Sequence, residues 1–183
     1  MTEVRETPIP GCVVVGFHRA HDDRGSFERA YSADELAEVG HGFWIVQANV
    51  ATTTRAGTVR GLHYQLAPYG EQKLVRCVRG AVFDVAVDLR EGSPARGRWF
   101  GIELTPENGL AILIPRGCAH GYLSLLPDSQ MVYFSDAAYW PAAERVLAAE
   151  HEETGIVWPI PVVESSAKDA AASRTDRPEW SGY

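Results

Sequence analysis

The sequence predicts a mainly β protein, a β-sandwich or barrel with few helices. Short apolar or alternating segments follow one another along the 183 residues. Turn-forming residues separate them, as at Gly80, Pro115 and Pro127. Only one early segment has a convincing helix pattern. Many short strands separated by turn residues are typical of sandwiches and barrels.

The expected strands alternate or run apolar throughout. Their ranges are 12–17, 43–50, 72–78, 81–89, 98–104, 110–114, 121–126 and 131–136, and 60–65 around His63 also has a strand pattern. Alternation is clearest in 81–89. There, one face carries Ala81, Phe83, Val85, Val87 and Leu89, and the other carries Val82, Asp84, Ala86 and Asp88.

A helix is expected where the sequence reads SADELAEVG. Ser32 is a good N-cap, Glu35 completes a capping box three residues later, and Gly40 ends the helix. Residues 142–153 form a weaker second helix candidate. The polar tail from Glu164 is expected to be a loop or a docked end.

Length and composition indicate one domain over 1–183, because 45% hydrophobic residues suffice for a real core. No apolar run is long enough to span a membrane, and the N-terminus lacks a signal-peptide pattern. A soluble cytoplasmic protein is therefore expected. Cys12, Cys77 and Cys118 form no CxxC pair, so free buried thiols are expected rather than a disulfide framework.

The net charge of −7 argues against a broad nucleic-acid surface, which needs clustered lysines and arginines. A small anionic substrate stays compatible with this charge. A few arginines in one cleft act locally, because salt screens charges beyond roughly 8–10 Å.

His63 raises the question of a metal site, because a metal-binding barrel often places a second histidine two residues later. Here Gln65 occupies that position, and the remaining candidates are Glu71 and His120. Metal sites usually need three or more ligands, and the Lys73 ammonium would repel a divalent cation. We therefore expect no metal.

A metal-free base is the alternative for His63. A neutral imidazole can remove a proton from a carbon next to a carbonyl, and a cation must then face the enolate oxygen. Lys73 could supply this cation, and Tyr133 could return a proton from the opposite side. The acid that orients His63 stays open among Asp84, Asp88 and Asp169. Each of these residues taken singly is more often structural.

Taken together, these residues lie in longer motifs. The motifs are DDRGSF (22–27), QAN (47–49), GTVRGLHYQ (57–65), EQKLVRCVRGAVFDVAVDLREGSP (71–94), IPRGCAHGY (114–122), VYFSDAAYWP (132–141), WP (158–159) and SSAKD (165–169). In this order and spacing, the chain resembles the dTDP-4-dehydrorhamnose 3,5-epimerase family. The resemblance implies a cupin-like jelly-roll barrel with a few short peripheral helices.

The resemblance also implies an isomerase acting on a dTDP-linked 4-keto-6-deoxy sugar. His63 is similar to the family's base, with Asp169 or a nearby acid as its orienting partner. Tyr133 is similar to the general acid, and Lys73 to the residue that stabilises the enolate oxygen. The implied substrate-binding residues are Arg24 and Arg60 at the diphosphate, with Gln47, Asn49, His120 and Tyr139. The family is usually dimeric and needs no metal or other cofactor.

One geometric expectation concerns Arg60 and His63. In a regular strand these two side chains point to opposite faces. If both reach the substrate, the backbone must bulge between them, and Gly61 is the residue that permits it.

The chain departs from the family pattern in three places. Arg29 stands where many members have a glutamate, residues 148–159 replace a familiar segment, and Ala95 replaces a threonine. These changes indicate a different substrate or stereochemical outcome rather than lost activity. A C3-only epimerase of a specialised deoxysugar pathway is thus an alternative. Two functions of other classes are also considered. A non-catalytic sugar-nucleotide binder would lack the catalytic residues, and a metal-dependent cupin would need a full set of metal ligands.

Overall fold

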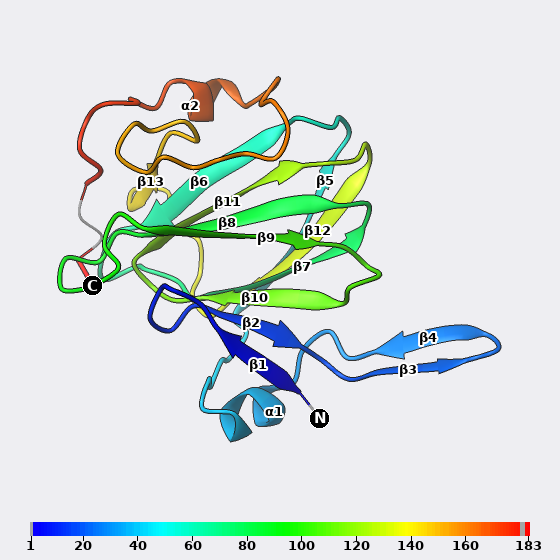
Figure 1. The fold of residues 1–183 in the computed structure, drawn as a ribbon. Helices are drawn as coiled ribbons and strands as arrows, with labels where there is room; N and C mark the ends of the chain where they lie inside the picture. The colour runs from blue at the N-terminus through cyan, green and yellow to red at the C-terminus, as the bar shows by residue number, and fades with distance from the viewer. Residues whose placement is uncertain (1, 180–181) are drawn as a thin grey trace.

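Two antiparallel sheets face each other in the computed structural model, which describes residues 2–179 and 182–183 (Figure 1). The six-stranded sheet contains, in order, β1 (Glu3–Glu6), β2 (Val13–Gly16), β10 (Leu110–Ile114), β7 (Lys73–Arg79), β12 (Ser129–Ser135) and β5 (Gln47–Thr53). The five-stranded sheet contains β13 (Glu144–Val146), β6 (Val59–Gln65), β11 (Cys118–Ser124), β8 (Val82–Asp88) and β9 (Trp99–Leu104). This arrangement confirms the mainly β prediction and agrees with a cupin-like jelly roll.

The sheets are covered on their outer faces as well as packed against each other. Val75, Ile112 and Met131 of one sheet meet Val82 and Ala86 of the other in the central core. Helix α1 (Ala33–Glu38) covers the outer face of the six-stranded sheet through its buried residue Leu36. Leu147, Ile156 and Trp158 cover the outer face of the five-stranded sheet. Strands buried on both faces read as continuous apolar runs, which explains segments such as LAILI.

Strand alternation decides which polar side chains enter the barrel. On β8, Phe83 and Val85 pack outward, so Asp84 points inward with Val82 and Ala86. The same rule puts Lys73 on the inward face of β7 with Val75, and Tyr133 on the inward face of β12 with Met131. Polar residues that interrupt the apolar pattern therefore line the interior.

The expected bulge lies in β6. His63 pairs with His120 and Arg60 pairs with Tyr122, so β6 has one more residue than β11 across this step. Gly61 adopts φ +99°, a conformation that only glycine takes without cost. A Cβ on Gly61 would lie 2.7 Å from the carbonyl oxygen of His120. As predicted, Arg60 and His63 consequently face the same cavity.

The first expected helix is confirmed, and the second is wrong. Ser32 caps α1 by accepting a hydrogen bond from the Glu35 amide. Residues 142–153 instead contain the short strand β13, which pairs with β6. Leu62 and Leu147 exchange backbone hydrogen bonds of 3.0 and 2.9 Å. Pairing with the open edge of β6 overrides the weak local helix preference.

The polar tail is a docked end. Val59 donates to the carbonyl of Glu164, and Thr58 pairs with Glu164 in a parallel bridge. A single-turn helix, α2 (Ala167–Ala170), follows and contacts β6. Its residue Asp169 is buried.

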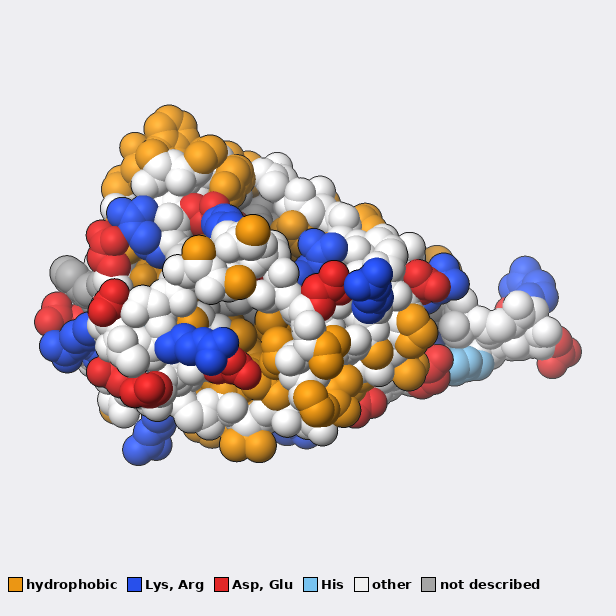
Figure 2. Space-filling view, turned by 90° about the horizontal axis from the view of Figure 1, so that it is seen from above, with side chains coloured by type: hydrophobic (Ala, Val, Ile, Leu, Met, Phe, Trp, Pro, Cys, Tyr) orange, Lys and Arg blue, Asp and Glu red, His pale blue; other side chains and the backbone are white. Residues whose placement is uncertain are grey.

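A hairpin of β3 (Arg19–Asp22) and β4 (Gly25–Glu28) extends away from the two sheets as an arm, with charged side chains at its tip (Figures 1 and 2). Its base is attached to the body by Glu28. The Glu28 carboxylate pairs with Arg19 at 2.5 Å and with Arg76 of β7 at 2.6 Å. Phe27, by contrast, is 77% exposed.

The three cysteines are free and buried, as expected. Burial raises the pKa of Cys12 to about 12 and that of Cys77 to about 11, so neither thiol forms the nucleophilic thiolate near neutral pH. In the described part of the chain, no helix has the length and apolarity to cross a membrane.

Candidate active site

An inner chamber of about 150 Å³ opens between the two sheets. The five-stranded sheet contributes His63 and His120, and the six-stranded sheet contributes Lys73 and Tyr133 from the opposite wall. The remaining wall is formed by Ala51, Arg60, Val75, Gly121, Tyr122 and Met131. The chamber therefore brings together five of the residues predicted for chemistry or substrate binding, which are Arg60, His63, Lys73, His120 and Tyr133.

An outer chamber of about 350 Å³ adjoins the inner one, and Arg60 and His63 line both. Its other walls come from the end of β5, the start of β6 and the docked tail. They comprise Thr53, Thr54, Thr58, Val59, Glu164, Ser165, Ser166, Lys168 and Asp169. Together the chambers form one cleft. Apolar and polar residues both line its inner end, and mostly polar residues line its mouth.

Asp169 is the acid that contacts His63. Its Oδ1 lies 2.7 Å from Nε2 of His63, and its Oδ2 accepts the Gly61 amide at 3.2 Å. The Ser166 hydroxyl accepts the Asp169 amide at 3.0 Å and so caps α2. Burial alone raises the pKa of Asp169, but the His63, Gly61 and Ser166 contacts outweigh it and hold the pKa below 3.8. The carboxylate is therefore ionised beside His63.

The other two candidate acids have different partners. Asp84 is fully buried and contacts Nε2 of His120 at 2.9 Å. Asp88 pairs with Arg90 at 2.7 Å and accepts the Ser93 hydroxyl. The site thus contains two histidine–aspartate pairs. Their histidines, His63 on β6 and His120 on β11, are directly opposite each other in the ladder.

Lys73 and Tyr133 are neighbours on the wall opposite His63. Tyr133 pairs with Val75, so Lys73 lies diagonally beside it on the same face. Lys73 contacts the Glu71 carboxylate at 3.1 Å. Burial raises the pKa of the Tyr133 phenol, and the negative charge of Glu71 adds to this effect. Tyr133 is therefore a neutral phenol at physiological pH.

Arg60 is fixed at the junction of the chambers. Its Nε donates to the Thr53 hydroxyl at 3.0 Å, and its Nη2 donates to the Thr52 carbonyl at 2.8 Å. Among the residues that the structure describes, no carboxylate forms an ion pair with it. An arginine without a carboxylate partner at a cleft mouth suits an anionic ligand.

Gln47 and Asn49 lie on the same face of β5 as Ala51, which lines the inner chamber. Gln47 Nε2 donates to Asn49 Oδ1 at 3.1 Å. The buried Nδ2 of Asn49 has no hydrogen-bond partner among the described residues. Tyr139 lines neither chamber, and its hydroxyl donates to Glu144 at 2.6 Å.

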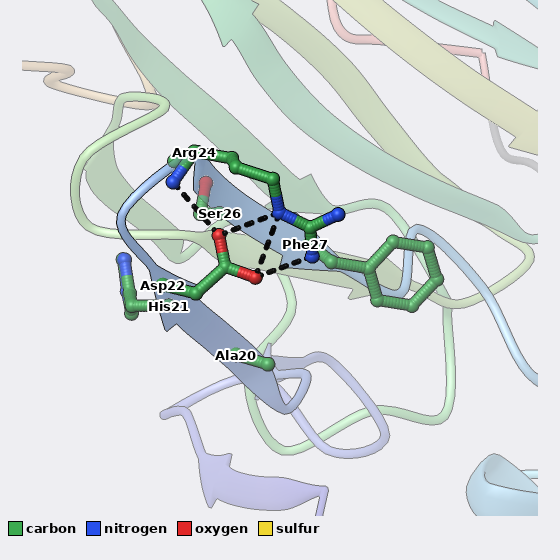
Figure 3. A pocket seen from close by; sticks show the side chains of 7 residues that line it. Ala20, His21, Asp22, Arg24, Ser26 and Phe27 are labelled. Atoms are coloured by element: carbon green, nitrogen blue, oxygen red, sulfur yellow. Dashed lines mark hydrogen bonds and ion pairs between the residues drawn. The ribbon is translucent and has the colours of Figure 1, made fainter.

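Arg24, like Tyr139, is a predicted site residue that lines neither chamber. It lies at the tip of the arm, with 90% of its side chain exposed. In Figure 3 its guanidinium folds back over Asp22, and the two groups pair at 2.6 Å. The departure at Arg29, near this arm, also lies outside both chambers, since Arg29 pairs with Glu35.

Gln65 stands at the position where a second metal ligand was sought. It is 3% exposed, and its side chain forms hydrogen bonds with backbone groups. Its amide nitrogen donates to the Tyr69 carbonyl at 3.0 Å, and its oxygen accepts the Trp140 amide at 2.6 Å. Within the described residues, no group of three or more histidines, cysteines or acids could hold a metal ion.

Sequence reasoning missed Thr53, Glu144 and Lys168. Thr53 shares the inward face of β5 with Gln47, so continuing the alternation would have found it. Lys168 lines the outer chamber and pairs with Glu144 at 2.5 Å. No local signal predicts that pair, because β13 and α2 are separate elements that the fold brings together beside β6.

Comparisons with known proteins identify the family of the chain. A family model described as dTDP-4-dehydrorhamnose 3,5-epimerase matches residues 6–176. A Sinorhizobium fredii protein of that name is 43% identical over 142 residues, 75% of this chain and 71% of its own. A dTDP-4-dehydrorhamnose 3-epimerase from Streptomyces niveus is 39% identical over 92% of this chain and 82% of its own.

A crystal structure of dTDP-4-dehydrorhamnose 3,5-epimerase from Bacillus anthracis, with TDP and PPi bound, is similar with a TM-score of 0.92. It is 34% identical, and the match covers 94% of this chain and 99% of that one. Fold and sequence thus agree over nearly the whole chain. This protein belongs to the dTDP-4-dehydrorhamnose 3,5-epimerase family and is a carbohydrate epimerase of the isomerase class.

Proposed function

We propose that the protein epimerises a dTDP-linked 4-keto-6-deoxy sugar by moving protons at C3, at C5 or at both. One observation carries the proposal. The His63–Asp169 pair faces Lys73 and Tyr133 across a chamber of about 150 Å³. A base, a cation and an acid arranged around one small cavity suit proton removal and return at a carbon next to a carbonyl.

His63 acts as the base through Nδ1. An ionised carboxylate only accepts hydrogen bonds, so the Nε2 of His63 carries the proton shared with Asp169. Nδ1 then has the free lone pair. It removes the proton from C3 or C5, and the electron pair of the broken C–H bond moves toward the C4 carbonyl oxygen. The Lys73 ammonium stabilises the resulting enolate, and the Tyr133 phenol returns a proton from the opposite wall.

The nucleotide end of the substrate occupies the outer chamber. Arg60 binds the diphosphate, because its guanidinium has no carboxylate partner among the described residues and lies where the chambers meet. His120 and the buried Asn49 amide offer polar contacts to the sugar, and Gln47 supports Asn49. The related Bacillus anthracis structure has TDP and PPi bound, which supports a dTDP-linked substrate.

The active form is a homodimer in which the arm of one chain reaches the cleft of its partner. Arg24 and Phe27 are both highly exposed on an arm that extends from the body. Because Arg24 lies outside its own cleft, it contacts a diphosphate only if it acts in the partner subunit. The cytoplasmic location stays a prediction.

The first test is proton NMR in deuterated water with dTDP-4-keto-6-deoxyglucose. Deuterium at C3 and C5 would identify a 3,5-epimerase, and deuterium at C3 alone a 3-epimerase. The 3-epimerase named from Streptomyces niveus makes the second outcome a specific alternative. Exchange at neither carbon would contradict the proposed substrate.

We expect His63→Ala to lower the exchange rate at least about 100-fold, because the base is removed. The substrate should still bind, since the diphosphate contacts are intact. His18→Ala is the matched control, because His18 is exposed and lies outside both chambers. Near-normal exchange in the His63 variant would exclude His63 as the base.

A further inference from the structure

Glu71 is a carboxylate that the proposed reaction does not use, and it contacts Lys73 of the inner chamber. It lies in the loop between β6 and β7, and its Oε1 is 3.1 Å from the Lys73 ammonium. The two side chains are only 13% and 12% exposed. Within the part of the chain that the structure describes, Glu71 is the carboxylate that forms an ion pair with Lys73. Because water is mostly excluded, this contact is stronger than a surface ion pair.

The loop that carries Glu71 is held on both sides. Arg116 donates to the Gly70 carbonyl at 3.0 Å and pairs with Asp136 at 2.7 Å. The other oxygen of Asp136 accepts the Gln72 amide at 2.7 Å. The residues before and after Glu71 are thus tied to one another through a single arginine–aspartate pair. The backbone position of Glu71 is therefore set by the fold.

Glu71 also affects Tyr133. Burial is the larger cause of the raised pKa of the phenol, the charge of Glu71 raises it further, and Arg60 opposes both. The other titratable groups around the phenol come from three strands. They are Lys73 on β7, His63 on β6, and His120 and Tyr122 on β11. Glu71 contacts the proposed cation, Lys73, and its charge also raises the pKa of the proposed general acid, Tyr133.

We propose that Glu71 is a positioning residue, whose carboxylate holds the Lys73 ammonium against the chamber wall beside Tyr133. The inference rests on the function proposed above. Without Glu71, the long lysine side chain has no fixed direction, and the cation no longer meets the enolate oxygen as charge develops there. The phenol also loses the neighbouring negative charge that favours its protonated form.

The direct test compares Glu71→Gln with the wild-type protein by carbon NMR of labelled tyrosine. The Tyr133 signal is assigned by its loss in Tyr133→Phe. We expect the pKa of Tyr133 to be lower in Glu71→Gln. Glu103→Gln removes the same charge from an exposed position on β9 and should leave the titration unchanged. An unchanged Tyr133 titration in Glu71→Gln would overturn the proposal.

Kinetics provide the second readout. We expect kcat of Glu71→Gln to fall about 10-fold or more, with KM changed less than about 3-fold, because the lost interaction matters mainly in the transition state. The alkaline limb of the inversion rate should move to lower pH. Glu71→Asp keeps the charge and should restore part of kcat. A normal kcat in Glu71→Gln, or no gain in Glu71→Asp over it, would overturn the positioning role.

These readouts separate the two proposals. If the wild-type protein shows no deuterium exchange, the proposed function fails, while the NMR titration still reports whether Glu71 controls Tyr133. If exchange occurs but the Glu71 variants titrate and turn over like the wild type, the further inference alone fails.

Discussion

At the scale of single residues, the environment distinguishes two histidine–aspartate pairs that look alike. Asp84 is fully buried behind His120, whereas Asp169 comes from the docked tail and also accepts a backbone amide. His63 lines both chambers, but His120 lines only the inner one. The proposal of His63 as the base therefore depends on its place at the junction of the two chambers.

Asp169→Asn should leave His63 in place but remove the charge that orients it. We expect kcat to fall by up to about 10⁴-fold, the loss when asparagine replaces the orienting aspartate of a catalytic triad. The deuterium-exchange rate measures this effect, with Glu103→Gln as the control of equal charge change. An exchange rate within a few-fold of the wild type would contradict an orienting role.

The same variant tests acid stability. The folded-state pKa of Asp169 lies below the ordinary value of 3.8 for an aspartate, so its stabilising contribution is present above that value. The contribution is lost as pH falls through the lower folded-state pKa. Melting temperatures measured from about pH 2 to pH 6 should therefore fall less steeply on the acid side in Asp169→Asn than in the wild type.

At the scale of elements, one extra residue in β6 turns two opposite side chains toward one cleft. The bulge needs both a positive φ at Gly61 and close contact with β11. Gly121 fits the same contact from the other side, because a Cβ there would lie 2.5 Å from the Arg60 carbonyl oxygen. The two glycines thus permit the close approach of β6 and β11 at the bulge, which turns both side chains toward the cleft.

Gly61→Ala should destabilise the protein and abolish turnover. A positive φ costs a non-glycine residue about 1–2 kcal/mol, and the added Cβ would clash with the His120 carbonyl. Gly97→Ala is the control, because it shares the positive φ but has open space around the new Cβ. Urea unfolding should show a larger decrease in the free energy of unfolding for Gly61→Ala than for Gly97→Ala. Equal losses with full activity in both variants would argue against the bulge as a site-forming element.

At the scale of the whole molecule, the arm is the feature without an explanation inside one chain. Glu28 fixes its base through Arg19 and Arg76, yet its tip exposes Phe27 and Arg24. Apolar and basic groups held away from the body suit contact with a second subunit. A dimer would then complete each cleft with residues of two chains.

Mixed dimers test this arrangement. Arg24→Ala should raise KM about 10-fold by removing a charge-assisted contact, and His63→Ala should be inactive. If Arg24 acts in the partner's cleft, a dimer of the two variants has one complete site. Because half of the dimers formed at equal mixing are hybrids, activity should reach roughly a quarter of the wild-type value at low substrate.

The control for this experiment is the oligomeric state of each variant, measured by light scattering. A mixture no more active than the separate variants would place Arg24 outside the partner's site. A monomeric wild-type protein would contradict the dimer itself.

The sequence by itself determined the β class, the first helix and the inward side chains. Alternation within seven-residue strands carried Lys73, Tyr133 and Asp84 into the interior, and Ser32 capped α1 through a contact three residues away. The need for a bulge at Gly61 followed from the spacing of Arg60 and His63, given that the family resemblance assigns both residues to the substrate. These features depend on interactions between near neighbours in the chain, which a sequence records directly.

Only the tertiary structure decided which acid meets His63, what residues 142–153 form and where Arg24 lies. Asp169 is separated from His63 by 106 positions, and β13 is a strand because the edge of β6 was available to pair with it. The arm leaves Arg24 outside its own cleft. Such outcomes depend on which distant segments pack together, and neither local periodicity nor capping carries that information.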